Sequence, residues 1–187
     1  MTAAGPWRRL MLAALSLVLA GVLFHANVAS ALVTRGDDAL RAGDVEGAVR
    51  YYARAARLDA GSLVAADRLA FFLLMRRRAG DAARAYAIAD GVLRARPAGS
   101  RTSDPSSTSA LLADRALAAL RLGNAHAAEQ DFATAAAAAA DPRYAFLAAR
   151  AAIRRGDRAA AREHLRAALQ FDASYAPARS LVARLGR

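Results

Sequence analysis

The sequence predicts an all-α protein, on three observations. Alanine accounts for 55 of the 187 residues, and leucine and arginine are also abundant, so strong helix formers dominate the chain. Proline and glycine, which interrupt helices, number only five and twelve. Residues with β-branched side chains, which favour strands, are few. The length is that of one ordinary domain.

The composition excludes several kinds of site. With no cysteine, the chain has no disulfide, thiolate zinc site, cysteine nucleophile or lipid-modified N-terminal cysteine. The formal net charge of +11 raises nucleic acid as a partner, because arginine neutralises phosphate. However, no aromatic residues are interleaved with the arginines for base stacking, so we do not expect a nucleic-acid partner. All 27 basic residues are arginine, which is typical of a GC-rich genome, and they form either a functional surface or solvated helix faces.

The N-terminus has the pattern of a membrane anchor or a signal peptide. Arg8 and Arg9 precede an uncharged apolar run from Leu10 to Phe24, which predicts a cytoplasmic N-terminus. In one interpretation, residues 1–28 are a cytoplasmic tip and an uncleaved transmembrane helix of the bacterial inner membrane, with the remainder periplasmic. In the other, cleavage after Ala31 releases a soluble periplasmic or secreted module. We favour the anchor, because the repeat fold described below needs the segment from residue 29 onward.

A four-residue pattern, Arg-x-Gly followed by Asp or Asn, occurs four times in the remainder of the chain. The copies are Arg41-Ala-Gly43-Asp44, Arg78-Ala-Gly80-Asp81, Arg121-Leu-Gly123-Asn124 and Arg154-Arg-Gly156-Asp157. Three positions after each glycine also recur. They hold Ala48, Ala85, Ala128 and Ala161 at five residues, Tyr52, Ala89, Phe132 and Leu165 at nine, and Ala55, Val92, Ala135 and Ala168 at twelve.

This spacing predicts helical hairpins. Glycine ends the first helix by adopting a positive φ, and the Asp or Asn that follows caps the second helix. The arginine two residues before the glycine lies in the last turn of the first helix, where a cation complements the helix dipole. The positions five, nine and twelve residues after the glycine fall on one face of the second helix, which packs against the first.

The repeats resemble those of the tetratricopeptide family over residues 29–175. The glycines are 37, 43 and 33 residues apart, near the roughly 34 residues of that repeat. Gly36 and Pro97 match the first-helix glycine and the closing proline of the family, although the first-helix tryptophan is missing. The resemblance implies a repeat domain over 29–187, with an exposed loop at 98–109. It comprises repeats at 29–62, 66–99, 109–142 and 142–175 and a capping helix at 177–185.

The resemblance also implies where a partner binds. In this family the first helices of the hairpins line a concave groove that holds a peptide or a helix. The groove would be apolar with an arginine border, which suits an amphipathic or acidic segment of a protein partner. The expected groove residues are Asp67, Leu74, Arg77, Arg78, Leu117, Arg121, Arg143, Phe146, Arg150, Ile153 and Arg154.

We expect neither catalysis nor a metal or cofactor. His126 and Glu129 lie three residues apart, and Glu163 adjoins His164, but neither pair has the spacing of a metalloprotease helix. The sequence has no glycine-rich phosphate loop, no nucleophile elbow and no lysine.

The sequence therefore predicts a membrane-anchored scaffold that binds another polypeptide and assembles or maintains a bacterial envelope or secretion complex. Two alternatives remain at this stage. One is the soluble module released by cleavage, and the other is a non-catalytic docking subunit of an enzyme complex.

Overall fold

Every regular element in the computed structural model, which describes residues 6–95 and 105–186, is an α-helix. The all-α prediction is confirmed over these ranges. The chain divides into two compact units, Met1–Ala65 and Ala66–Arg187, which we describe separately. The helices are α1 (Pro6–Arg41), α2 (Val45–Leu58), α3 (Leu63–Arg76), α4 (Asp81–Arg94), α5 (Pro105–Arg121), α6 (Ala125–Ala139), α7 (Pro142–Arg155), α8 (Arg158–Phe171) and α9 (Ala176–Leu185).

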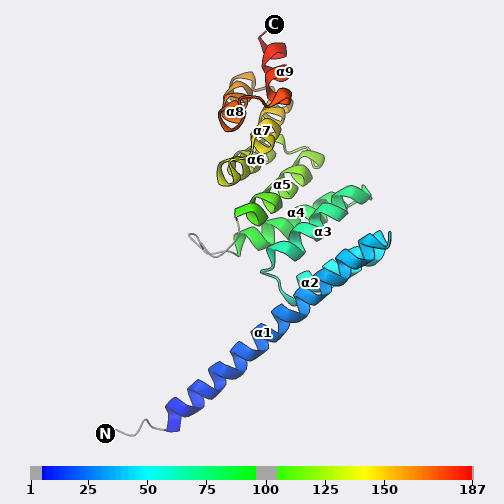
Figure 1. Cartoon of the computed structure of the whole chain (residues 1–187), viewed down its shortest axis with the longest axis vertical. Coiled ribbons are helices and arrows are strands. Elements are labelled where there is room, and N and C mark those ends of the chain that lie inside the picture. Colours follow the sequence, from blue (N-terminus) through cyan, green and yellow to red (C-terminus); the bar gives the residue numbers. More distant parts are fainter. Residues whose placement is uncertain (1–5, 96–104, 187) are drawn as a thin grey trace, which may run out of the picture. The chain divides into compact units, whose positions relative to one another are not determined.

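The first unit consists of α1 and α2 with the start of α3. The N-terminal part of α1 extends well beyond α2 (Figure 1), and its large apolar side chains from Trp7 to Phe24 are exposed. The first buried residue of α1 is Ala29, which packs with Ala55 and Ala65. Among the described helices, α1 is long and apolar enough to cross a membrane.

Tyr52 joins the two long helices of this unit. Its ring lies against Gly36, where an added Cβ would be 2.5 Å from Tyr52 Cε1. Its hydroxyl donates a hydrogen bond of 2.6 Å to Asp37. Tyr52, one of the large residues at the recurring second-helix positions, therefore packs against the first-helix glycine in this hairpin.

Three of the four predicted helix caps are present. Asp44, Asn124 and Asp157 accept hydrogen bonds from backbone amides at the start of α2, α6 and α8, at 2.7, 3.0 and 2.9 Å. The glycine before each residue has a φ between +81° and +88°, as the turn requires.

The prediction was wrong for the turn between α3 and α4. Here Gly80 is itself the N-cap, and Asp81 is the first residue of α4. Asp81 is buried and pairs with Arg76 at 3.1 Å instead of capping the helix. Arg78, expected in the last turn of α3, lies beyond the end of that helix. This turn is longer than the other three turns that contain the recurring glycine, because α3 ends four residues before Gly80.

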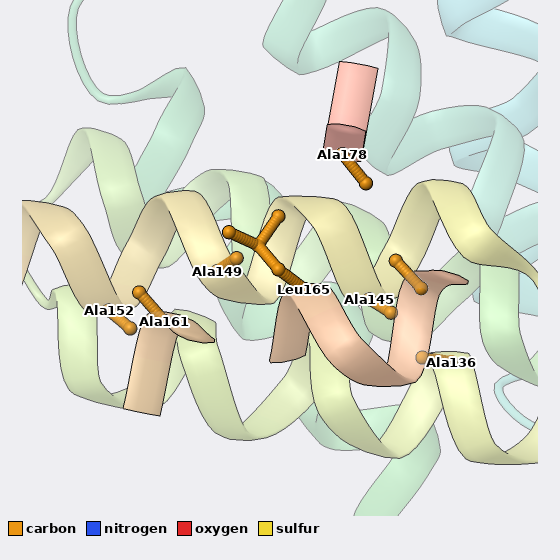
Figure 2. Packing of buried hydrophobic residues seen from close by; sticks show 8 residues of the cluster. Ala136, Ala145, Ala149, Ala152, Ala161, Leu165 and Ala178 are labelled. Carbon is orange, nitrogen blue, oxygen red and sulfur yellow. The ribbon is translucent and has the colours of Figure 1, made fainter. Parts of the chain in front are cut away.

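The packing face predicted for the second helices is confirmed. All twelve residues at the three recurring positions are buried, and the most exposed is Val92, at 7%. Figure 2 shows the core around α7 and α8, where Leu165 lies among alanines that include Ala149 and Ala161. Because alanine is so small, neighbouring helices approach closely, and a few larger side chains fill the space between them.

The second unit contains the hairpins α3–α4, α5–α6 and α7–α8, and α9 packs against α8. Residues 98–104 of the predicted exposed loop lie outside the described residues. The remaining part, from Pro105 to Ser109, forms the first residues of α5, and Ser109 is buried. Proline is well suited to the first position of a helix, since its missing N–H has no intrahelical partner there.

Candidate binding groove

The expected groove residues lie on α3, α5 and α7 or directly after α3, all within the second unit. Asp67, Phe146 and Ile153 are half-buried, while Leu74 is buried. The exposed members are Arg77, Arg78, Leu117, Arg121, Arg143, Arg150 and Arg154. The apolar members are therefore less exposed than the arginines, except for Leu117, which is exposed as well.

Three of the arginines come together where α3 and α5 end. A hollow of about 300 Å³ is lined by Arg77, Arg78, Ala82 and Arg121, and we call it the arginine hollow. Arg121 donates a hydrogen bond to the backbone carbonyl of Leu74, so α5 is fixed against α3 at this point. Guanidinium groups gathered in one hollow are suited to binding a carboxylate.

A second hollow has a more apolar lining. Phe146, Arg150 and Ile153 of α7 and Leu181 and Arg184 of α9 line a volume of about 440 Å³, which we call the terminal hollow. The guanidinium of Arg150 lies 6.0 Å from the centre of the Phe146 ring, within the range of a cation–π contact. The hollow therefore offers an apolar surface with two cations beside it.

Phe146 is fixed on its other side by an aromatic neighbour. Its ring meets the ring of Tyr175 edge to face, with centroids 5.9 Å apart. Tyr175 directly precedes α9, so this contact places the first turns of α7 beside the start of α9. The sequence predicts α9 only as a cap, and Leu181 and Arg184 are not among the expected groove residues. Leu181 and Arg184 are three residues apart, which places them on one face of the helix that also carries the buried Ala178. This spacing was the signal that the sequence offered.

Several solved structures are similar to the chain. MamA from Desulfovibrio magneticus RS-1 has a TM-score of 0.61 at 23% identity, over 78% of this chain and 76% of that one. A tetratricopeptide protein of Thermus thermophilus, TTC0263, has a TM-score of 0.61 at 18% identity, over 94% of each chain. A tetratricopeptide repeat protein from Parabacteroides merdae has a TM-score of 0.64 at 18% identity, over 85% of this chain and 59% of that one. No protein-family model and no curated protein matches the chain.

The chain has the tetratricopeptide-repeat fold. The helical hairpins, the buried second-helix face and the structural neighbours agree on this assignment. Stacked hairpins of this kind present an extended surface.

Arg143 differs from the other arginines among the expected groove residues. Its guanidinium pairs with Asp141, the N-cap of α7, at 2.6 Å between Nη2 and Oδ2. This hydrogen bond holds the pKa of Asp141 below its ordinary value. The charge of Arg143 is therefore partly engaged in starting α7.

Two histidines have neighbours that the sequence analysis did not pair. His164 of α8 lies 3.0 Å from Glu129 of α6, and Glu129 also accepts a hydrogen bond of 3.0 Å from Arg155 of α7. His126 lies 3.2 Å from Gln130 on the same helix. Within the described ranges, no group of three or more His, Asp and Glu side chains is placed to hold a metal ion.

Asp114 of α5 was not among the expected groove residues, although it lies on the first helix of its hairpin. It is 5% exposed, and burial raises its pKa to about 8, with a further contribution from the charge of Asp67. The only indication of this buried residue in the sequence was that it is the single aspartate of the run Ala110–Leu120, where it stands between alanine and arginine.

Proposed function

We propose that the protein is a membrane-anchored scaffold whose tetratricopeptide groove binds an amphipathic, acidic segment of a protein partner in a bacterial envelope or secretion complex. The terminal hollow carries this proposal. It combines apolar contacts from Phe146 and Ile153 with the cations of Arg150 and Arg184, which matches a segment that bears both apolar and carboxylate side chains.

The burial pattern of α1 supports the anchor over the cleaved module. Cleavage after Ala31 would divide a continuous helix and remove Ala29, which is 1% exposed in the core of the first unit. By contrast, none of the described side chains of α1 from Trp7 to Val28 is buried. About 20 helical residues are enough to span the hydrocarbon layer, so this stretch has the length that an anchor needs.

Site-specific photo-crosslinking in the native host tests the groove. Benzoylphenylalanine at position 181, inside the terminal hollow, should crosslink to a partner segment that contains Asp or Glu. The same probe at the exposed position of Phe171 on α8 should not. A crosslinked segment with no acidic residue would contradict the proposed partner chemistry.

Charge reversal gives this experiment a matched control. The double variant Arg150→Glu/Arg184→Glu should abolish the crosslink, because the cations that bind the segment become anions. The variant Arg158→Glu/Arg166→Glu makes the same change in net charge on exposed positions of α8 and should retain the crosslink. Equal crosslinking in both variants would remove the terminal hollow from the proposal.

The anchor is tested by the mass and location of the mature protein. A chain that retains residues 1–31 and stays with the membrane after alkaline extraction is the expected result. A soluble chain beginning at Leu32 would contradict the anchor and support the released module.

A further inference from the structure

Asp114 carries a carboxylate oxygen that the protein itself does not satisfy. The residue is 5% exposed, and within the described parts of the chain its Oδ2 is the buried side-chain atom without a hydrogen-bond partner. Leaving a buried polar group unpaired is costly, so most such atoms in proteins have a partner. A group of this kind indicates a site that an external group completes.

Asp67 of α3 and Asp114 of α5 lie at corresponding positions relative to the contact that joins the two helices. The side chain of Arg121 contacts the carbonyl of Leu74, which links the two helices near their C-terminal ends. Asp114 lies seven residues before Arg121 on α5, and Asp67 lies seven residues before Leu74 on α3. Seven residues correspond to two helical turns. Each carboxyl group is therefore two turns from the contact that joins the two helices.

The pKa shifts of Asp114 and Asp67 are consistent with this placement of their carboxyl groups. The pKa of Asp114 is raised first by burial and then by the negative charge of Asp67. Burial also raises the pKa of Asp67, and neighbouring Arg68 opposes that effect. Asp67 is only half-buried, so it gives solvent access to a pair whose second member lies deeper.

Tyr144 belongs to α7, which is the first helix of the third hairpin in this unit. Burial raises the pKa of this phenol, and the charges of Asp141, Asp67 and Asp114 add smaller contributions in the same direction. Arg115, the cation next to Asp114 in sequence, is bound instead to Asp90 and Asp131 at 2.9 and 2.6 Å. The neighbouring arginine is thus committed to other carboxylates.

We propose that Asp67 and Asp114 form a subsite for one cationic side chain, lysine or arginine, of the partner segment that occupies the groove. This proposal rests on the proposed function and adds a chemical feature to the partner. A cation supplies the missing hydrogen bond of Asp114 and favours the ionised form of both carboxyl groups in a partly desolvated place, where charge-assisted hydrogen bonds are strong.

The position of the subsite defines the spacing of charges in the partner. Asp114 lies two turns, or roughly 10.5 Å, from Arg121, which lines the arginine hollow. A segment that fills both places carries a basic and an acidic residue about three residues apart if extended. The corresponding separation is about seven residues if the segment is helical.

Ethylguanidinium is a suitable probe, because it presents the charged group of arginine without the rest of a partner. Added to the full-length protein in detergent micelles, it should lower the titration midpoint of Asp114, followed by the carboxyl ¹³C resonance, by about one pH unit. Sodium chloride at the same ionic strength and the neutral N-ethylacetamide should each leave the midpoint unchanged. A midpoint that moves equally with sodium chloride would overturn the proposal.

Variants locate the effect. Asp67→Asn should abolish the response of Asp114 to ethylguanidinium, whereas Glu163→Gln, which removes an exposed carboxylate on α8, should leave it intact. Asparagine keeps the shape of aspartate, and an unchanged near-ultraviolet circular dichroism spectrum confirms that the variant is folded. A full response in Asp67→Asn would overturn the pairing.

The partner arm uses a synthetic peptide with the sequence of the segment crosslinked at position 181. Replacing its basic residue by glutamine should weaken binding about tenfold to the wild-type protein and not at all to Asp67→Asn/Asp114→Asn. Equal weakening in both proteins would contradict the subsite. The ethylguanidinium titration needs no partner, so it can fail while the crosslink persists, and the crosslink can fail while the titration succeeds.

Discussion

Arg115 of α5 holds Asp131 of α6 through two hydrogen bonds, 2.8 Å from Nε to Oδ2 and 2.6 Å from Nη2 to Oδ1. The same guanidinium reaches Asp90 of α4 at 2.9 Å, so one cation links two successive hairpins. All three side chains are more than four-fifths buried.

Removing this cation should destabilise the protein strongly. Arg115→Ala removes the buried partner of Asp131 and leaves Asp90 with only the exposed Arg94, and we expect a loss of about 3–5 kcal/mol in the free energy of unfolding. Urea denaturation followed by circular dichroism measures it. Arg94→Ala is the matched control, because Arg94 pairs with the same Asp90 but is 76% exposed. That variant should lose at most about 0.5 kcal/mol, and equal losses would contradict the role assigned to burial.

The glycines of the helices provide a second test of packing. Gly36→Ala places a Cβ 2.5 Å from Tyr52 Cε1, and we expect overpacking to cost about 1–3 kcal/mol in stability. Gly91→Ala, in the interior of α4, meets nothing within 4 Å and should stabilise the protein by about 0.5–1 kcal/mol. Opposite signs in thermal unfolding are the expected result, and a stabilised Gly36→Ala protein would contradict the Tyr52 contact.

The α3–α4 turn shows why one repeat departs from the pattern that predicted it. The sequence pattern treats Asp81 and Asn124 alike, because both follow the recurring glycine. Only the tertiary structure reveals that α3 ends early and that Arg76 takes Asp81 as a buried partner. The helical spacing predicted the twelve buried positions correctly, since it depends on local geometry alone.

The candidate site was predictable only in part, for a related reason. Positions on the first helices follow from the repeat, and this located Phe146, Arg150 and Ile153. The contributions of Leu181 and Arg184 depend on how α9 packs beside α7, which no repeat describes. Asp114 was missed because its burial depends on neighbouring helices rather than on its own helix.

Asn124 and Asp81 both follow a turn glycine, but their replacement by alanine should reduce stability by different amounts. Asn124→Ala removes one cap hydrogen bond from α6 and should cost about 1 kcal/mol in stability. Asp81→Ala removes the buried carboxylate that binds Arg76 and should cost about 3–5 kcal/mol. Urea denaturation of both variants checks the ratio, and similar small losses would mean that Asp81 acts as an ordinary cap residue.

The raised pKa of Asp114 makes stability depend on pH in an unusual direction. In the folded protein this carboxyl keeps its proton up to about pH 8, whereas in the unfolded chain it loses it near pH 3.8. Between these values the folded state binds more protons, so the free energy of unfolding falls as pH rises, by at most about 1.4 kcal/mol per pH unit. Asp67 acts in the same direction. The lowered pKa of Asp141 acts in the opposite direction and only as pH falls below about 4, where its stabilising contribution is lost.

Urea denaturation at intervals from pH 5 to pH 8 measures this slope. Asp114→Asn keeps the shape of the side chain and removes the proton, so its slope should be flatter and its stability at pH 8 higher than in the wild type. Asp67→Asn should shift the steep region to lower pH, because the charge that raises the pKa of Asp114 is gone. A wild-type stability that rises steadily over this interval would show that Asp114 ionises freely in the folded protein and that burial does not raise its pKa.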